Sequence, residues 1–216
     1  MHVHGPQEAQ RNENIVSDKA VIKVNVLRSS FSGIERKKRR VNGDRRTNEM
    51  ERVIKDIYRY FFHNINTTFS PTYSLVYSGN ILLDLYPRSE IVIIVHILEV
   101  DGSILSTIIN AVSMALMDAG VMMKDIITAC NVGVMRSNIC VDLTNMEEIH
   151  CSSSLFIAIK SRSNVNNIVY MNLDKKINPE QLQACLDEAT ANCLLIRGQI
   201  EKGMKENMQE LKSRLL

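Results

Sequence analysis

Three consecutive residues, Asp101-Gly102-Ser103, have the types and the position of an anion-binding turn. They follow a run of β-branched and aliphatic residues at 91–100 and precede a helical pattern at 104–120. Gly102 permits a tight turn, and Ser103 is a suitable N-cap residue. Because the first N–H groups of a helix have no partner within it, they attract anions. The pattern predicts either an anion site above the turn or a helix that Ser103 simply caps.

A basic segment at 28–47 is the second feature with recognisable chemistry. Its cations are concentrated, although the net charge of the whole chain is only +2. Such a cluster favours contact with a polyphosphate such as nucleic acid. A solvated loop and a nuclear-localisation patch are the two alternatives. The clustered cations are Arg36, Lys37, Lys38, Arg39, Arg40, Arg45 and Arg46.

A helix expected at 49–62 positions part of this segment. Apolar residues recur there at three- and four-residue spacing. Arg45 and Arg46 fall at or just before its N-terminus, where positive charge opposes the helix dipole. A local rule that is broken at a helix start indicates a functional role.

Apolar runs and turn residues predict the strands around these segments. The run at 91–100 suits a strand buried on both faces. Residues 5–19 are polar and aperiodic, which indicates a loop. A long helix is expected to begin at Asn178-Pro179 and to continue almost to Leu216. The other strands are expected at 20–27, 126–134, 138–143, 155–160 and 167–172, the last four as two hairpins.

Composition narrows the class of protein. A chain of 216 residues with 45% hydrophobic and 23% charged residues suits a soluble globular domain. No apolar run reaches membrane-spanning length, and no signal peptide is recognisable. The five cysteines are odd in number and lack C-x-x-C spacing, so we expect reduced thiols and no structural zinc. The two histidines at 2 and 4 are weak evidence for a metal site.

Several segments together resemble the RNase PH family, and within it the exosome-ring subunits that carry the catalytic aspartate in archaeal exosomes. The resemblance implies one α+β domain over 1–216, with antiparallel sheets and sandwiched helices. It also marks 63–85 as an atypical insertion, 179–216 as a C-terminal helix, and the family's first strands as missing. The matching segments are HGPQE at 4–8, FSGIERKKRR at 31–40, GDRRTNEM at 43–50, the block 86–125, ACNVGV at 129–134 and CVDLTNMEE at 140–148.

Active members of this family degrade RNA from its 3′ end with inorganic phosphate as nucleophile, and acidic residues hold Mg²⁺. The resemblance implies that Gly102 and Ser103 bind phosphate and that Asp142 and Glu148 are the catalytic and metal-binding acids. It implies RNA, other RNase PH-like subunits of a hexameric ring and cap subunits as partners, and no membrane. The residues expected to contact RNA are Arg36, Lys37, Lys38, Arg45 and Arg46.

Two departures from the family pattern alter the expected activity. Ile104 stands where active members have an arginine, and an aliphatic side chain supplies neither charge nor hydrogen bonds. Glu148 stands where they have the shorter aspartate. We therefore expect an RNA-binding ring subunit without efficient phosphorolysis, located in the nucleus, nucleolus and cytoplasm.

Two other functions remain open on the sequence alone. The chain is an active phosphorolytic exoribonuclease if a neighbouring subunit or Arg88 replaces the missing arginine. It is a purely structural scaffold if the basic segment serves nuclear import.

Overall fold

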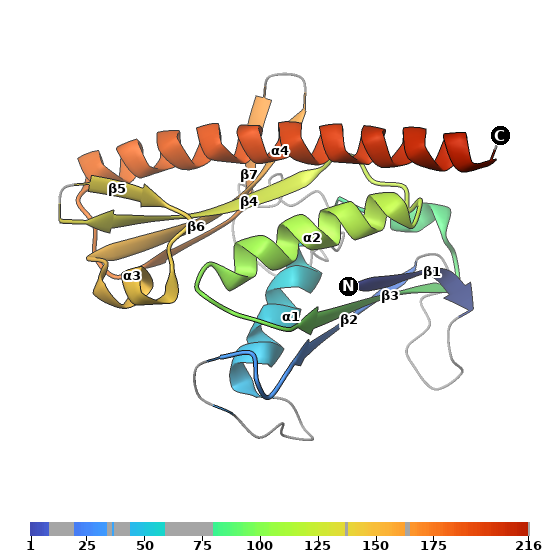
Figure 1. The fold of residues 1–216 in the computed structure, drawn as a ribbon, viewed down its shortest axis with the longest axis horizontal. Coiled ribbons are helices and arrows are strands. Elements are labelled where there is room, and N and C mark those ends of the chain that lie inside the picture. The colour runs from blue at the N-terminus through green and yellow to red at the C-terminus, as the bar shows by residue number, and fades with distance from the viewer. Residues whose placement is uncertain are drawn as a thin grey trace, which may run out of the picture. The chain divides into compact units, whose positions relative to one another are not determined.

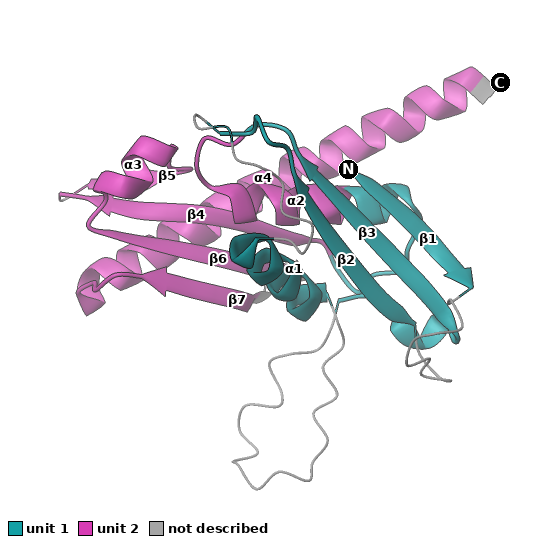
Figure 2. Ribbon diagram, turned by 90° about the horizontal axis from the view of Figure 1, so that it is seen from below, with its two compact units in different colours: residues 1–99, 115–125 teal, residues 100–114, 126–216 magenta. Residues whose placement is uncertain are grey.

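The computed structural model describes residues 1–8, 20–33, 36, 44–58, 80–136, 138–162 and 165–215. They form an α+β fold, as expected (Figure 1). The chain divides into two compact units, one of residues 1–99 and 115–125 and the other of residues 100–114 and 126–216 (Figure 2). The single domain expected over 1–216 stays a prediction.

The first unit contains a three-stranded sheet with the order β1-β3-β2. Its central strand β3 (Ser89–Ile97) pairs antiparallel with β1 (His2–Glu8) and parallel with β2 (Val21–Arg28). Along β3 the buried residues alternate with half-buried or exposed ones from Ile93 onward. The expectation of a strand buried on both faces was therefore wrong, because only one face of β3 is fully covered. The strand expected at 20–27 is confirmed as β2.

Strand β1 corrects the loop expected at 5–19. Residues 5–8 belong to β1, and residues 9–19 lie outside the described part of the chain. The pairing with β3 shifts register between His4 and Gln7, around Gly5-Pro6. Proline lacks an N–H donor, so it is tolerated at such an irregularity on an edge strand. Tertiary pairing therefore overrides the loop-like local composition.

Helix α1 (Arg45–Tyr58) packs on β2 and confirms the helix expected after the basic segment. Its buried residues, which include Ile54 and Ile57, face the sheet. Glu51 Oε1 also accepts a 2.8 Å hydrogen bond from the Val26 N–H of β2. Residues 59–79, which hold most of the expected insertion, lie outside the described residues. The end of that insertion forms a short 3-10 helix at Leu83–Leu85.

Helix α2 (Ile104–Asp118) follows the Asp101-Gly102-Ser103 turn. Its most buried side chains recur at helical spacing, as the sequence predicts. Gly120 adopts a φ of 67° and ends the helix. Its N–H donates to Met117 O, and Val121 N–H donates to Leu116 O, each at 3.1 Å. This is the Schellman pattern that favours glycine at that position. The buried residues of the helix's apolar stripe are Ile108, Ile109, Val112 and Leu116.

The second unit contains an antiparallel sheet with the order β5-β4-β6-β7, and helix α4 packs on β4 and β6. Both expected hairpins are confirmed, and the helix expected at 179–216 is confirmed as α4. A core of aliphatic and cysteine side chains lies between sheet and helix, as burial of one face of each requires. The elements are β4 (Ile127–Met135), β5 (Asn138–Val141), α3 (Asn145–His150), β6 (Ser153–Arg162), β7 (Val165–Asp174) and α4 (Pro179–Leu215).

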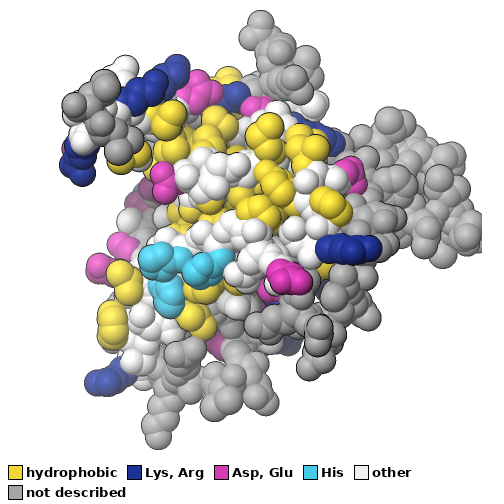
Figure 3. Space-filling model, turned by 90° about the vertical axis from the view of Figure 1, so that its right-hand side faces the viewer, with side chains coloured by type: hydrophobic (Ala, Val, Ile, Leu, Met, Phe, Trp, Pro, Cys, Tyr) yellow, Lys and Arg dark blue, Asp and Glu magenta, His cyan; other side chains and the backbone are white. Residues whose placement is uncertain are grey.

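The described residues contain neither a cluster of metal-binding side chains nor a membrane-spanning helix. No group of three His, Cys, Asp or Glu side chains there is placed to hold a metal ion. Histidine side chains do gather on one face (Figure 3). The rings of His2 and His96 meet edge to face with centroids 6.4 Å apart. All five cysteines are free. No described helix is long and apolar enough to cross a membrane.

Candidate functional site

The Gly102-Ser103 turn is held tightly against the segment that follows β5. Both residues adopt the left-handed backbone region, with φ values of 84° and 46°. A Cβ added to Gly102 would lie 2.6 Å from the carbonyl carbon of Thr144 and 2.8 Å from the nitrogen of Asn145. Only glycine fits this position, because both the backbone angle and the space exclude a side chain.

Ser103 is buried and its hydroxyl group is already bonded within the protein. Its Oγ donates to Leu143 O at 3.0 Å and accepts from Asn131 Nδ2 at 3.4 Å. The expectation that this hydroxyl caps α2 was therefore wrong, because it is directed to Leu143. Ser103 still occupies the N-cap position, because its carbonyl accepts the first helical bond, from Thr107 N–H at 3.3 Å. The same carbonyl accepts from Ser106 Oγ at 2.7 Å and from Thr107 Oγ1 at 3.2 Å.

Glu148, from α3, places its carboxylate at the amide of the turn. Its Oε1 accepts hydrogen bonds from Ser103 N–H at 3.3 Å and from Asn131 Nδ2 at 3.0 Å. The backbone donor that an incoming anion would use is thus engaged by an anion of the protein itself. A phosphate group would have to displace this carboxylate or approach it against like-charge repulsion.

Asn131, in β4, joins the parts of this site. Its backbone carbonyl accepts from the Asp142 N–H at 2.9 Å, while its side chain bonds Ser103 and Glu148. Asn131 is buried, with 6% exposure, and its Oδ1 has no hydrogen-bond partner among the described residues. Sequence reasoning missed this residue. The available signal was an asparagine within the otherwise apolar ACNVGV segment, since buried polar groups need partners.

Asp142 follows β5 as an exposed residue with a φ of 58°. It therefore joins Gly102 and Ser103 in the left-handed region. Non-glycine residues held in that region store strain, and such strain gathers at functional sites. The structure thus brings together four sequence-predicted residues, Gly102, Ser103, Asp142 and Glu148, around Asn131.

A capping box fixes the segment between the two acids. Glu147 Oε2 accepts from the Thr144 N–H and from its hydroxyl, each at 2.9 Å. These hydrogen bonds hold the pKa of Glu147 below its ordinary value, because they favour the charged form. Asp101 Oδ1 adds a bond from the Asn145 N–H at 3.3 Å. The position of Glu148 is thus set by a locally ordered turn.

The acids expected to hold Mg²⁺ do not form a ready ligand set in this conformation. Glu148 Oε1 accepts hydrogen bonds from two N–H donors, which compete with a cation for that oxygen. Asp142 alone presents an exposed carboxylate. Magnesium is usually bound by one or two carboxylates together with water and substrate oxygens. A role for Mg²⁺ therefore stays a prediction, and we assign it no step.

The predicted RNA contacts belong to the first unit, whereas the turn and both acids belong to the second. Arg45 and Arg46 form the exposed first turn of α1, and Arg36 is exposed. Lys37 and Lys38 lie outside the described residues. Convergence of these cations on the turn stays a prediction.

Comparisons with known proteins cover almost the whole chain. A sequence profile of the 3′ exoribonuclease (RNase PH) family, domain 1, matches residues 1–122, and the profile of domain 2 matches residues 125–192. The sequence is similar to the exosome complex component ski6 of Schizosaccharomyces pombe, with 26% identity over 95% of this chain and 75% of that protein. It is also similar to the putative exosome complex component RRP41 of Caenorhabditis elegans, with 31% identity over 88% of this chain and 70% of that protein.

A solved structure shows the same fold. The crystal structure of rice Rrp46 matches with a TM-score of 0.73 and 19% sequence identity, covering 94% of this chain and 81% of that one. This confirms the expected fold class.

Proposed function

Because the chain belongs to the 3′ exoribonuclease (RNase PH) family, we propose that it is an RNA-binding subunit of an exosome core ring that lacks efficient phosphorolysis of its own. The similar proteins of yeast and nematode named as exosome components support the ring assignment. The proposed partners are RNA, other RNase PH-like subunits of a hexameric ring, and cap subunits. The proposed locations are the nucleus, the nucleolus and the cytoplasm.

One observation supports the loss of phosphorolysis more than any other: the Glu148 carboxylate accepts the hydrogen bond of the Ser103 N–H. Phosphorolysis requires a phosphate anion to approach the anionic RNA backbone, so donors and cations must offset both charges. Here the turn offers a carboxylate in place of a free amide, and Ile104 adds no charge. Loss of one such donor typically costs about 3–4 kcal/mol in the transition state.

RNA binding is assigned to the basic segment. Arg36, Lys37, Lys38, Arg45 and Arg46 match the positions that contact RNA in the family. The two arginines of α1 are exposed, and the first turn of that helix contains no acidic residue. Cations at a helix N-terminus cost stability, so contact with phosphate groups gives a physical reason for their position.

An active phosphorolytic enzyme is the second candidate function. The observation in its favour is that Asn131 contacts both predicted acids, through the backbone N–H of Asp142 and the carboxylate of Glu148. This function would need Mg²⁺ and inorganic phosphate, together with an arginine from elsewhere.

An assay on the assembled ring distinguishes the two functions. The ring is incubated with poly(A), Mg²⁺ and phosphate, and nucleoside diphosphate is measured. We expect no release above that of a ring with Asp142→Asn. Release that requires Asp142 would establish the enzyme and refute the proposed function.

A further inference from the structure

The last turns of α4 extend beyond the sheet of their own unit. Figure 1 and Figure 2 both show the helix continuing past the strands on which it packs. Its core contacts end at Ile196, and Ile200 is its last buried residue. From 202 to 214 only Met204 is half-buried, and the other side chains are exposed. This segment is therefore a helix whose surface the described residues leave largely uncovered.

The apolar stripe of α4 nevertheless continues into this segment. Ile200, Met204, Met208 and Leu211 follow one another at four- and three-residue spacing, which places them on one face. Met208 is 55% exposed and Leu211 is 46% exposed. A row of large apolar side chains on an exposed helix face is characteristic of an interaction surface.

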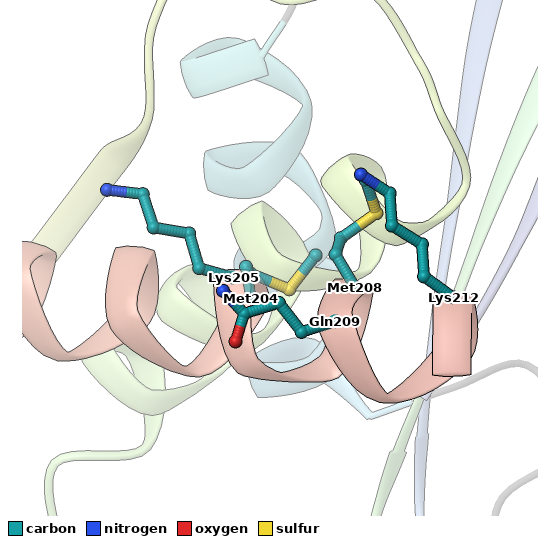
Figure 4. Close-up of a pocket in the computed structure, with 5 residues that line it drawn as sticks. All are labelled: Met204, Lys205, Met208, Gln209 and Lys212. Atoms are coloured by element: carbon teal, nitrogen blue, oxygen red, sulfur yellow. The ribbon is translucent and has the colours of Figure 1, made fainter. Parts of the chain in front are cut away.

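A shallow, open groove of about 360 Å³ lies between side chains of α4 on this face. Figure 4 shows Met204 and Met208 between the side chains of Lys205 and Lys212, with Gln209 beside them. The two methionines give a flexible apolar floor, which suits binding of a variable hydrophobic partner. The two lysines stand seven residues apart, which is about 10.5 Å along a helix.

The charges of the segment single out these two lysines. The other cations pair with carboxylates four residues away: Arg197 with Glu201 at 2.8 Å, Lys202 with Glu206 at 3.9 Å, and Arg214 with Glu210 at 2.6 Å. Lys205 and Lys212 form no ion pair with any described residue. Lys205 and Lys212, which border the apolar groove, are thus the lysines of this segment without a carboxylate partner among the described residues.

We propose that this groove docks an amphipathic helix of another protein, with an apolar ridge on Met204 and Met208 and carboxylates facing Lys205 and Lys212. Helix-in-groove binding uses such anchors at spacings of three, four and seven residues. A second copy of α4 fits less well, because its three nearby glutamates are already paired. RNA also fits less well, because a methionine floor offers nothing to phosphate groups. The inference is independent of the proposed ring and RNA functions.

Two synthetic helical peptides with the same leucine ridge test this proposal. One has glutamates on its flanks two turns apart, and the other has lysines at the same positions. Binding of each labelled peptide to the full-length protein is measured by fluorescence anisotropy. We expect the glutamate peptide to bind about tenfold more tightly than the lysine peptide, since complementary charges set specificity. The double variant Lys205→Glu/Lys212→Glu should reverse this preference. The variant Met208→Ser should weaken the binding of both peptides.

A matched control carries the same charge change away from this segment, in Lys55→Glu/Lys176→Glu. It should leave the preference unchanged, and circular dichroism should show equal helix content in all variants. Equal binding of the two peptides, or no binding of the glutamate peptide, would overturn the proposal. Self-association abolished by Met208→Ser would overturn it in favour of a second copy. RNA affinity lost only in Lys205→Glu/Lys212→Glu would overturn it in favour of RNA.

Discussion

The Glu148 carboxylate accepts a hydrogen bond from the Ser103 amide, at the turn where the family pattern places the phosphate nucleophile. Asn131 donates to the same oxygen at 3.0 Å and holds it there. One carboxylate oxygen thus accepts hydrogen bonds from two groups, the Ser103 N–H and the Asn131 side chain, that lie far apart in the sequence. This relationship yields the first of the following predictions.

Phosphate should not stabilise the wild-type protein, but it should stabilise Ile104→Arg/Glu148→Gln. The double variant removes the negative charge at the turn and supplies a guanidinium group that binds phosphate well. A ligand that binds the folded state raises the melting temperature. Calorimetry in phosphate and in chloride of equal ionic strength measures the difference.

The matched control is Ile104→Arg/Glu99→Gln, which makes the same change of charge but keeps Glu148. Its melting temperature should be little higher in phosphate than in chloride. Equal stabilisation of the wild type and the double variant would show that the Glu148 carboxylate does not obstruct the turn.

Replacing Gly102 should destabilise the fold strongly. Gly102→Ala introduces a Cβ beside the backbone of Thr144 at a φ of 84°, and we expect a loss of about 2–3 kcal/mol. Urea unfolding followed by circular dichroism measures the free energy of unfolding. Gly198→Ala is the control, because no atom lies within 4 Å of its added Cβ. In a helix this change should be neutral or stabilising, so equal losses in the two variants would contradict the described turn.

The contribution of Glu147 to stability should disappear in acid. Its pKa is lowered in the folded state by the hydrogen bonds from Thr144. A lowered folded pKa gives stability that is present above the unfolded pKa and lost as pH falls through the folded one. The wild type should therefore exceed Glu147→Gln in unfolding free energy at neutral pH, with the gap closing below about pH 4.5. A gap that persists in acid would mean that the carboxylate charge is not responsible.

One thiol should react much faster than the other four in the native protein. Cys140 is half-buried, whereas the other cysteines are buried. Burial also raises the pKa of the Cys185 thiol, which lowers its reactive thiolate fraction. Titration with an aromatic disulfide reagent should show one rapid thiol, absent in Cys140→Ser, and all five after unfolding. Several rapid thiols in the native state would contradict the described core.

RNA affinity should depend on the cations at the start of α1. Arg45→Gln/Arg46→Gln should weaken binding of single-stranded RNA and lower the slope of log affinity against log salt by about 0.7 per lost phosphate contact. Arg52→Gln/Lys55→Gln removes the same charge further along the helix and should have a smaller effect. Filter binding at several salt concentrations provides the measurement. Unchanged affinity in the first variant would favour the structural scaffold.

Local patterns predicted the second unit well. Each hairpin combines two largely apolar runs with a short intervening segment, and α4 begins with an asparagine-proline pair. These signals depend on residues close together in the sequence, so they predict the local structure without knowledge of the tertiary contacts. Strand β1 was missed for the opposite reason, because its evidence is its pairing with β3, about ninety residues away.

The sequence predicted which residues gather at the candidate site, but it did not predict the hydrogen bonds that join them. Gly102, Ser103, Asp142 and Glu148 lie around one residue, Asn131, that no motif marked. Asn131 reaches Ser103 across 28 residues and Glu148 across 17. Contacts of that separation depend on the register of the β4–β5 hairpin and on the capping box before Glu148. Sequence periodicity does not determine them.

Among the described residues the Oδ1 of Asn131 has no hydrogen-bond donor, and this bears on what holds the turn in place. An enclosed oxygen without a donor costs free energy, and a nearby internal carboxylate already supplies the negative charge that the start of α2 favours. The backbone around the turn thus has no need of a bound substrate to remain in place. The protein's own residues therefore set the geometry of this turn, whether or not an anion is bound there.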